Sequence, residues 1–311
     1  MKTAHILAAG AATVLLITSA SAQLYSNDFE TDTTANWQFN QSHTGSFANF
    51  FFDYSTVGIP QAPSGTGTRG LKMEANTPGT GLFSGMSVSP LGESFTGDYV
   101  LTFDCWQNFN GPFPGGGSGS TQVTQAGIGA PTNQVQFPGS TYTGLGFGGT
   151  GDGGSATDVR AYNGPGAPIA PATGVYAAGN TAAAVNNTHA YYAGFGNVPA
   201  PAAQLTLFPQ QTGNTAVGTF GMAWHRWRIE KLGNTVTWQI DGLLIATVTN
   251  PSFGGDNIFF GQFDINATSS TDPNARHLLF GLIDNVTVVP EPSSMAVLAL
   301  GGLALLRKRR K

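Results

Sequence analysis

The sequence predicts an all-β fold made of many short antiparallel strands joined by turns and long loops. The 43 glycines and 18 prolines punctuate the chain at short intervals, and β-branched and aromatic residues dominate the segments between them. Helical periodicity is nearly absent between the two terminal segments. Residues 23–289 are long enough to bury one substantial core, so length does not demand a second domain.

The clearest strands form a meander near the C-terminal end. Apolar and polar residues alternate along 223–231 and again along 235–240, and an apolar strand follows at 243–248. The first two segments are separated by Gly233-Asn234. The last two are separated by Asp241-Gly242, a pair suited to a two-residue hairpin turn whose central positions need positive φ.

Other strands are expected along most of the remaining chain, at 47–54, 69–75, 81–88, 98–106, 257–264 and 278–289. The middle region, 107–218, is rich in glycine and contains Arg160 as its only basic residue. Aromatic residues nevertheless recur through it, whereas disordered linkers are poor in aromatics. We therefore expect long, ordered surface loops with a few strands.

The N-terminal segment, 1–22, has the order of a secretory signal peptide. A basic residue at Lys2 precedes an apolar stretch, and small residues at Ala20 and Ala22 precede Gln23. This order predicts cleavage before Gln23 and export of the rest.

Charge and cysteine usage exclude several classes of function. Of the 13 Lys and Arg, five lie at 307–311 and one is Lys2, which leaves seven in the body against 16 Asp and Glu. A net charge near −9 without a basic stripe argues against nucleic acid and anionic membrane surfaces. A lone cysteine, Cys105, permits neither an intrachain disulfide nor a cysteine-based zinc site, and its strand context predicts a buried position.

The C-terminal segment, 290–311, resembles a known sorting signal. A Pro-Glu-Pro triplet, a short apolar run and a basic end resemble the PEP-CTERM signal of exopolysaccharide-forming Gram-negative bacteria, through Pro290, Glu291, Pro292, Arg307, Lys308, Arg309 and Arg310. The resemblance implies a hydrophobic sorting helix inserted transiently in the inner membrane and processed by an exosortase-type peptidase. The apolar run is shorter than the ~20 residues of a permanent span. The basic end is expected to stay cytoplasmic, and the processed protein is expected at the cell surface, outer membrane or extracellular matrix.

A second resemblance concerns the body, 23–289. The segment "AWHRWRIEKLGNTVTWQIDGLLIATV" resembles a hairpin of concanavalin A-like and laminin-G-like jelly rolls, and 24–40 and 279–288 resemble their first and last strands. The resemblance implies an antiparallel jelly-roll β-sandwich in which the two terminal strands pair in one sheet.

The jelly-roll resemblance also implies a candidate cofactor. Such carbohydrate-binding modules often hold a structural calcium ion near the paired termini, which makes Asp28, Glu30 and Asp284 the candidate ligands. Calcium requires a shell of oxygen atoms, to which backbone carbonyls would contribute. The alternative is that these carboxylates simply cap strand ends in solvent.

Catalytic patterns are missing from the sequence. Glu30-Thr31-Asp32 begins like the E-x-D-x-x-E strand of laminarinase-type jelly rolls but does not continue as one. The G-x-G-x-x-G letters at 144–149 lack a surrounding strand-to-helix unit, which indicates a chance match in Gly-rich coil. We therefore name no catalytic residue.

These observations predict an exported, non-catalytic protein that binds glycan or serves structurally. The alternative is a polysaccharide-degrading glycoside hydrolase or lyase with an unrecognised site. Aromatic side chains can stack on sugar rings, but an aromatic on a strand equally packs inward. This ambiguity applies to Trp37, Trp106, Trp224, Tyr191 and Tyr192.

Overall fold

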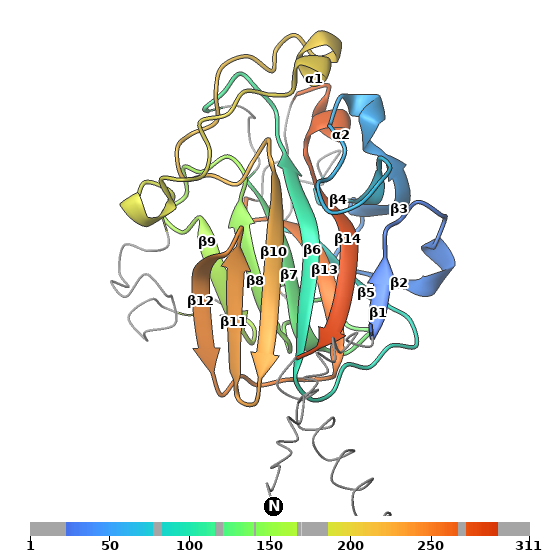
Figure 1. Cartoon of the computed structure of the whole chain (residues 1–311). Coiled ribbons are helices and arrows are strands. Elements are labelled where there is room, and N and C mark those ends of the chain that lie inside the picture. Colours follow the sequence, from blue (N-terminus) through green and yellow to red (C-terminus); the bar gives the residue numbers. More distant parts are fainter. Residues whose placement is uncertain are drawn as a thin grey trace, which may run out of the picture.

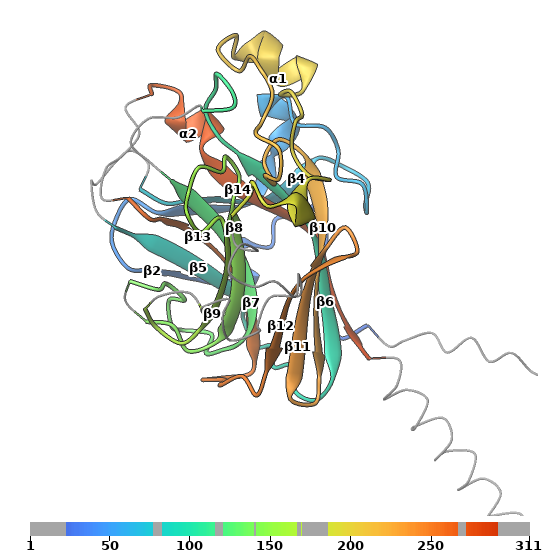
Figure 2. The ribbon, with the colours of Figure 1, turned by 90° about the vertical axis from the view of Figure 1, so that its left-hand side faces the viewer.

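The body is a sandwich of two antiparallel β-sheets (Figure 1). This computed structural model describes residues 23–76, 83–115, 121–139, 141–166, 169, 186–266 and 272–291. The two layers face each other across a shared core, which is clearest in Figure 2. The arrangement confirms the predicted all-β jelly-roll sandwich.

The larger sheet has eight strands and contains the predicted meander. Its order is β12 (Leu243–Thr249), β11 (Thr235–Ile240), β10 (Trp224–Leu232), β6 (Tyr99–Asn108), β14 (Phe280–Pro290), β4 (Arg69–Glu74) and β3 (Phe47–Asp53), with β1 (Tyr25–Asn27) also paired to β14. The predicted pairing of the terminal strands is confirmed, because Tyr25 lies opposite Val288 in an antiparallel ladder.

The smaller sheet has six strands, and short helices cluster in the loops. Its order is β2 (Trp37–Gln41), β5 (Gly85–Pro90), β13 (Asn257–Asp264), β7 (Gln122–Ala130), β8 (Leu145–Thr150) and β9 (Val159–Asn163). The helices are η1 (Thr34–Asn36), η2 (Tyr54–Val57), η4 (Ala190–Tyr192), α1 (Ala202–Leu207) and α2 (Ala275–Leu278). In Figure 1, α1 and α2 lie at the end of the sandwich opposite the last residues of β14.

Aromatic side chains join the two sheets. Phe103 of β6 meets Phe260 of β13 edge-on, with ring centroids 5.0 Å apart. Trp238 of β11 stacks on Phe147 of β8 at 5.3 Å. Such pairs add to the stabilisation that comes from burying their area.

The meander forms as its alternation predicts. Trp227 and Trp238 point inward and are almost completely buried, while polar neighbours on the same strands remain half-exposed. Asp241 and Gly242 both have positive φ, 50° and 80°, as the predicted hairpin turn requires. Cys105 is buried, as its strand context predicts.

The Gly-rich middle region contains more regular structure than its composition suggests. It includes β7, β8 and β9, and the G-x-G-x-x-G letters fall mainly on strand β8 rather than in coil, which corrects that part of the prediction. The glycines make room for rings: a Cβ added at Gly146 would lie 1.5 Å from the Tyr142 hydroxyl, and one at Gly127 would meet the Phe259 ring at 2.4 Å. Glycine is required at these two positions because aromatic side chains pack directly against the backbone, not because the backbone must be flexible.

Candidate functional site

An open groove of about 600 Å³ lies beside the paired terminal strands. Polar side chains from five parts of the chain line it, among them Asn27, Asn36, Ser64, Glu93, Arg226 and Asn285. Hydrogen bonds between the Asn27 side chain and the loop after β1 shape one wall. Asn27 Oδ1 accepts the Phe29 N–H at 2.8 Å, and Asn27 Nδ2 donates to Thr33 Oγ1 at 3.0 Å. Asn and Asp favour such local backbone bonds, and here they fix the loop after β1 without a helix or strand.

A buried carboxylate anchors the opposite wall. Asp104 of β6 is completely buried and lies directly opposite Asp284 of β14. It accepts hydrogen bonds from Ser64 N at 3.0 Å, Ser64 Oγ at 2.7 Å, Asn285 Nδ2 at 2.9 Å and the Arg226 guanidinium at 3.2 Å. Because a buried carboxylate must be paired and hydrogen-bonded, Asp104 holds these three groove-lining residues in place.

A bulge in β14 directs Asn285 toward this carboxylate. The ladder between β14 and β6 shifts register between Asp284 and Thr287, and Asn285 has a φ of 50°. Gly65 packs against the Asn285 side chain, where a Cβ would meet its Oδ1 at 1.9 Å. Bulges commonly re-aim a side chain in this way.

Asp284 lies in the interior behind the groove. Its Oδ2 accepts the Tyr54 hydroxyl at 3.0 Å, and its Oδ1 accepts the Asn285 N–H at 2.6 Å. Burial, together with the nearby charges of Asp104 and Glu30, raises the pKa of Asp284 to about 7. Burial disfavours the charged form of a carboxyl, so Asp284 gains a proton far more readily than a carboxyl in water.

The three predicted calcium ligands do not share one position. Glu30 lies in the same acidic neighbourhood as Asp284, and its Oε1 accepts the Arg69 N–H at 2.8 Å. Asp28 is exposed on the groove, and its Oδ1 accepts the Glu30 N–H at 3.2 Å. In all three residues, a carboxylate oxygen accepts a hydrogen bond from an N–H or O–H group of the protein. Within the described ranges, no group of three or more His, Cys, Asp or Glu is placed to hold a metal ion. The side chains as placed do not form a calcium shell, and calcium binding stays a prediction.

The aromatic residues considered for sugar stacking mostly belong to the core. Trp37, Trp106 and Tyr192 are buried. Trp224 and Tyr191 are half-exposed, but each donates to a backbone carbonyl, and neither lines the groove. The aromatic ring that does line it is Tyr25 of β1, which the sequence did not single out.

The predicted sorting motif begins inside the fold. Pro290 is the last residue of β14, and Glu291 is only 7% exposed. Pro292 and the basic residues Arg307, Lys308, Arg309 and Arg310 lie outside the described residues, as do the predicted sorting helix and signal peptide. None of the helices in the described part is long and apolar enough to cross a membrane.

Comparison with protein families supports the C-terminal assignment. Residues 288–311 match the family described as the PEP-CTERM protein-sorting motif, so the chain carries this signal. No curated protein matches the sequence significantly.

Several solved structures are similar to the body at low sequence identity. A protein of unknown function with a galectin-like fold from Bacillus subtilis is 10% identical, with 86% of this chain and 96% of that chain covered and a TM-score of 0.40. The Ca²⁺-bound exoplasmic/lumenal domain of VIP36 is 8% identical, with coverages of 86% and 90% and a TM-score of 0.39. The metal-free carbohydrate recognition domain of Emp46p is 10% identical, with coverages of 86% and 97% and a TM-score of 0.41.

Proposed function

We propose that this is an exported, non-catalytic protein whose groove binds a glycan. The observation that carries the proposal is the open polar groove of about 600 Å³ beside β1 and β14. Binding sites are concave and place a few polar groups precisely on a rigid frame. Here strand pairing and the hydrogen bonds of Asp104 hold Asn285 and Arg226.

The chemistry of the groove favours a neutral glycan. Sugar hydroxyls both donate and accept, so they complement the amides and hydroxyls of Asn27, Asn36 and Thr33. The lining carboxylates are Asp28 and Glu93, while the lining cation, Arg226, already pairs with Asp104. An anionic polysaccharide would therefore meet unpaired carboxylates, and like charges suppress binding.

The two terminal signals support delivery of this body to the cell exterior. We propose that 1–22 is removed on export and that an exosortase-type peptidase processes the PEP-CTERM signal at the inner membrane, leaving the body at the cell surface, outer membrane or extracellular matrix. The first strand begins at Tyr25, two residues beyond the expected N-terminus at Gln23. The PEP-CTERM match at 288–311 supports the processing step.

The direct test is a glycan array probed with residues 23–291. Binding to neutral glycans is expected, and Asn36→Ala should weaken it because this exposed side chain lines the groove without belonging to the core. Asn234→Ala is the matched control, an exposed asparagine outside the groove. Failure to bind any neutral glycan above background, or equal losses in both variants, would remove the groove from the proposal.

The two carboxylates on the groove define the enzymatic alternative. Asp28 and Glu93 both line it, and glycoside hydrolysis uses a carboxylate pair. Incubation with laminarin, agarose and pectin, followed by a reducing-sugar assay, separates the two functions. Turnover that disappears in both Asp28→Asn and Glu93→Gln would replace the binding proposal by a catalytic one.

A further inference from the structure

The first two residues of the sorting motif are built into the larger sheet. Pro290 lies opposite Tyr99 in the ladder between β14 and β6, and the Glu291 N–H donates to the Asp98 carbonyl at 3.2 Å. Glu291 is buried by these contacts. A peptidase that reads this motif must reach the side chain and the backbone amide of Glu291, and both are engaged in hydrogen bonds within the fold.

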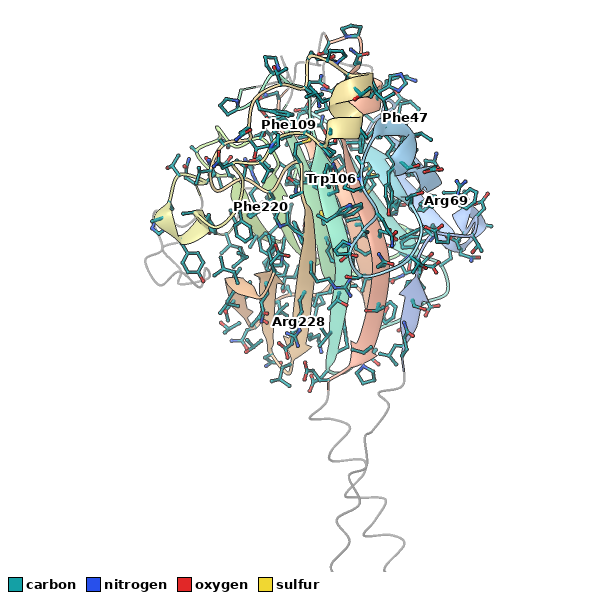
Figure 3. The ribbon with its side chains drawn as sticks, turned by 45° about the horizontal axis from the view of Figure 1, so that its top comes forward. Phe47, Arg69, Trp106, Phe109, Phe220 and Arg228 are labelled. Atoms are coloured by element: carbon teal, nitrogen blue, oxygen red, sulfur yellow. The ribbon has the colours of Figure 1, made fainter. Side chains whose placement is uncertain are left out.

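The Glu291 carboxylate is held by a side chain from a different strand. Arg228 of β10 donates from Nη2 to Glu291 Oε1 at 3.3 Å, and its Nη1 pairs with Glu230 on the same strand. Strand alternation places Arg228 and Glu230 together on the outer face of the sheet, because Trp227 and Ile229 point into the core. Figure 3 labels Arg228 on this strand.

The acidic groups at this position shift one another's pKa values. A hydrogen bond to Glu230, reinforced by burial, raises the pKa of Glu291 to about 7. The bond to Arg228 lowers the pKa of Glu230 to about 2. Asp98 is the further acidic group that acts on Glu291. Below a pH of about 7 Glu291 takes up a proton, and it then lies between the ionised Glu230 and the Arg228 guanidinium without adding a second negative charge.

We propose that Arg228, Glu230 and the Asp98 carbonyl form an intramolecular binding site for Pro290–Glu291, and that the motif must leave this site before a processing peptidase can bind it. The ligand is a glutamic side chain on an extended segment, supplied by the chain itself. Only the released fraction of molecules is a substrate, so the site lowers the apparent affinity of the peptidase by that fraction. The inference does not depend on the glycan groove.

Hydrogen exchange of the Glu291 amide tests the binding site directly. The full precursor is purified in detergent as the wild type and as the variants Arg228→Gln and Arg69→Gln. Hydrogen exchange of each protein is followed by mass spectrometry. Arg69 is the matched control, since its side chain is 33% exposed against 32% for Arg228 and it is likewise ion-paired, in its case with Asp53. It lies on β4, three strands from β10 in the sheet order (Figure 3).

The wild-type Glu291 amide is expected to be protected, and Arg228→Gln should speed its exchange about two- to five-fold, the range for a partly exposed ion pair. Arg69→Gln should leave the rate unchanged. An unprotected wild-type amide, or equal rates in wild type and Arg228→Gln, would overturn the binding site. Melting temperatures of the three proteins establish that the variants are folded.

Pulse-chase conversion of precursor to processed protein tests the release step. In cells carrying the peptidase, Arg228→Gln should be processed faster by the same factor, with Arg69→Gln at the wild-type rate. The motif itself is unaltered in both variants, so its recognition sequence is constant. Faster amide exchange in Arg228→Gln with an unchanged processing rate would overturn the claim that release precedes processing.

Discussion

Two arginines on β10 have similar exposure but are expected to differ strongly in their effect on stability. Arg226 and Arg228 lie two residues apart on the same face of the strand, and their side chains are 34% and 32% exposed. Their partners differ: Arg226 pairs with Asp104, whose side chain is fully buried, whereas Arg228 pairs with the half-exposed Glu230 and with Glu291. We predict that Arg226→Gln destabilises residues 23–291 much more than Arg228→Gln does.

The difference follows from what each substitution leaves behind. Removing one partner of a buried ion pair costs about 3–5 kcal/mol because the remaining charge stays buried. Asp104 keeps three hydrogen bonds from Ser64 and Asn285, and Arg226 is partly exposed, so about 2–3 kcal/mol is expected. Arg228→Gln breaks a partly exposed pair with Glu230 that is worth at most about 1 kcal/mol. The buried Glu291, whose pKa is raised to about 7, can take up a proton instead of remaining as an unpaired charge.

Urea denaturation of the two variants measures these free energies. For a domain of this size the loss in Arg226→Gln corresponds to a fall in melting temperature of about 4–12 °C. In a double-mutant cycle, Arg226→Gln should cost far less in an Asp104→Asn background, where no buried charge remains. Equal losses in the two arginine variants, or no coupling in the cycle, would refute the assignment of Asp104 as the anchor of the groove wall.

Three further predictions concern pH, metal and packing. Burial raises the pKa of Asp264 to about 6 and that of Asp152 to about 7, so the folded state retains protons that the unfolded chain releases. The stabilisation from these two groups is fully present below their ordinary pKa of 3.8 and is lost as the pH rises through about 6 and 7. Urea titrations should therefore give a free energy of unfolding that falls as the pH rises over this range, the reverse of a body stabilised by paired carboxylates. If calcium binds as the sequence predicts, a chelator should lower the melting temperature by several degrees, and an unchanged melt removes the metal. Gly146→Ala should destabilise by about 1–3 kcal/mol through overpacking against Tyr142, while Gly115→Ala, with no atom within 4 Å of its added Cβ, should be neutral in the same urea titrations.

The fold was largely predictable because its strands carry strong local signals. Alternation along β10 and β11 and the Asp241-Gly242 turn specify the meander without any long-range information. The Gly-rich strands β7 and β8 were harder to predict from the sequence. Where glycine occupies alternate positions, one face of the strand has no side chains, and the apolar–polar alternation that marks a strand is lost. On the face of the smaller sheet turned away from the shared core, the space beside these glycines is filled by rings from elsewhere, such as Tyr142 and Phe259, which no local pattern reveals.

The site was less predictable, because it depends on side chains from separate strands. Asp104 was overlooked inside an apolar strand, although a single acid in such a context is itself a signal, since a buried charge needs a partner. Its partner, Arg226, is 122 residues away in sequence. The candidate ligands Asp28, Glu30 and Asp284 were predicted to lie near the paired termini; Glu30 lies close to Asp284, and Asp28 lines the groove beside the paired strands.

Strand β14 connects the groove to the sorting motif, and this limits where processing can cut without damage. Its bulge presents Asn285 to the groove, and its last residues hold β1 through the bond from Leu24 N–H to the Val288 carbonyl at 2.8 Å. Val288 is fully buried, and removing such a side chain from the core costs about 1.5–3 kcal/mol. A cut before Val288 would remove the partner of Leu24 and Tyr25 and so weaken the hold on β1 at one wall of the groove, whereas a cut after Glu291 would leave these contacts intact. Because the matched signal begins at residue 288, the sandwich and the sorting signal share residues, and we expect processing of the kind proposed above to preserve the fold only if it cuts toward the C-terminal side of that overlap.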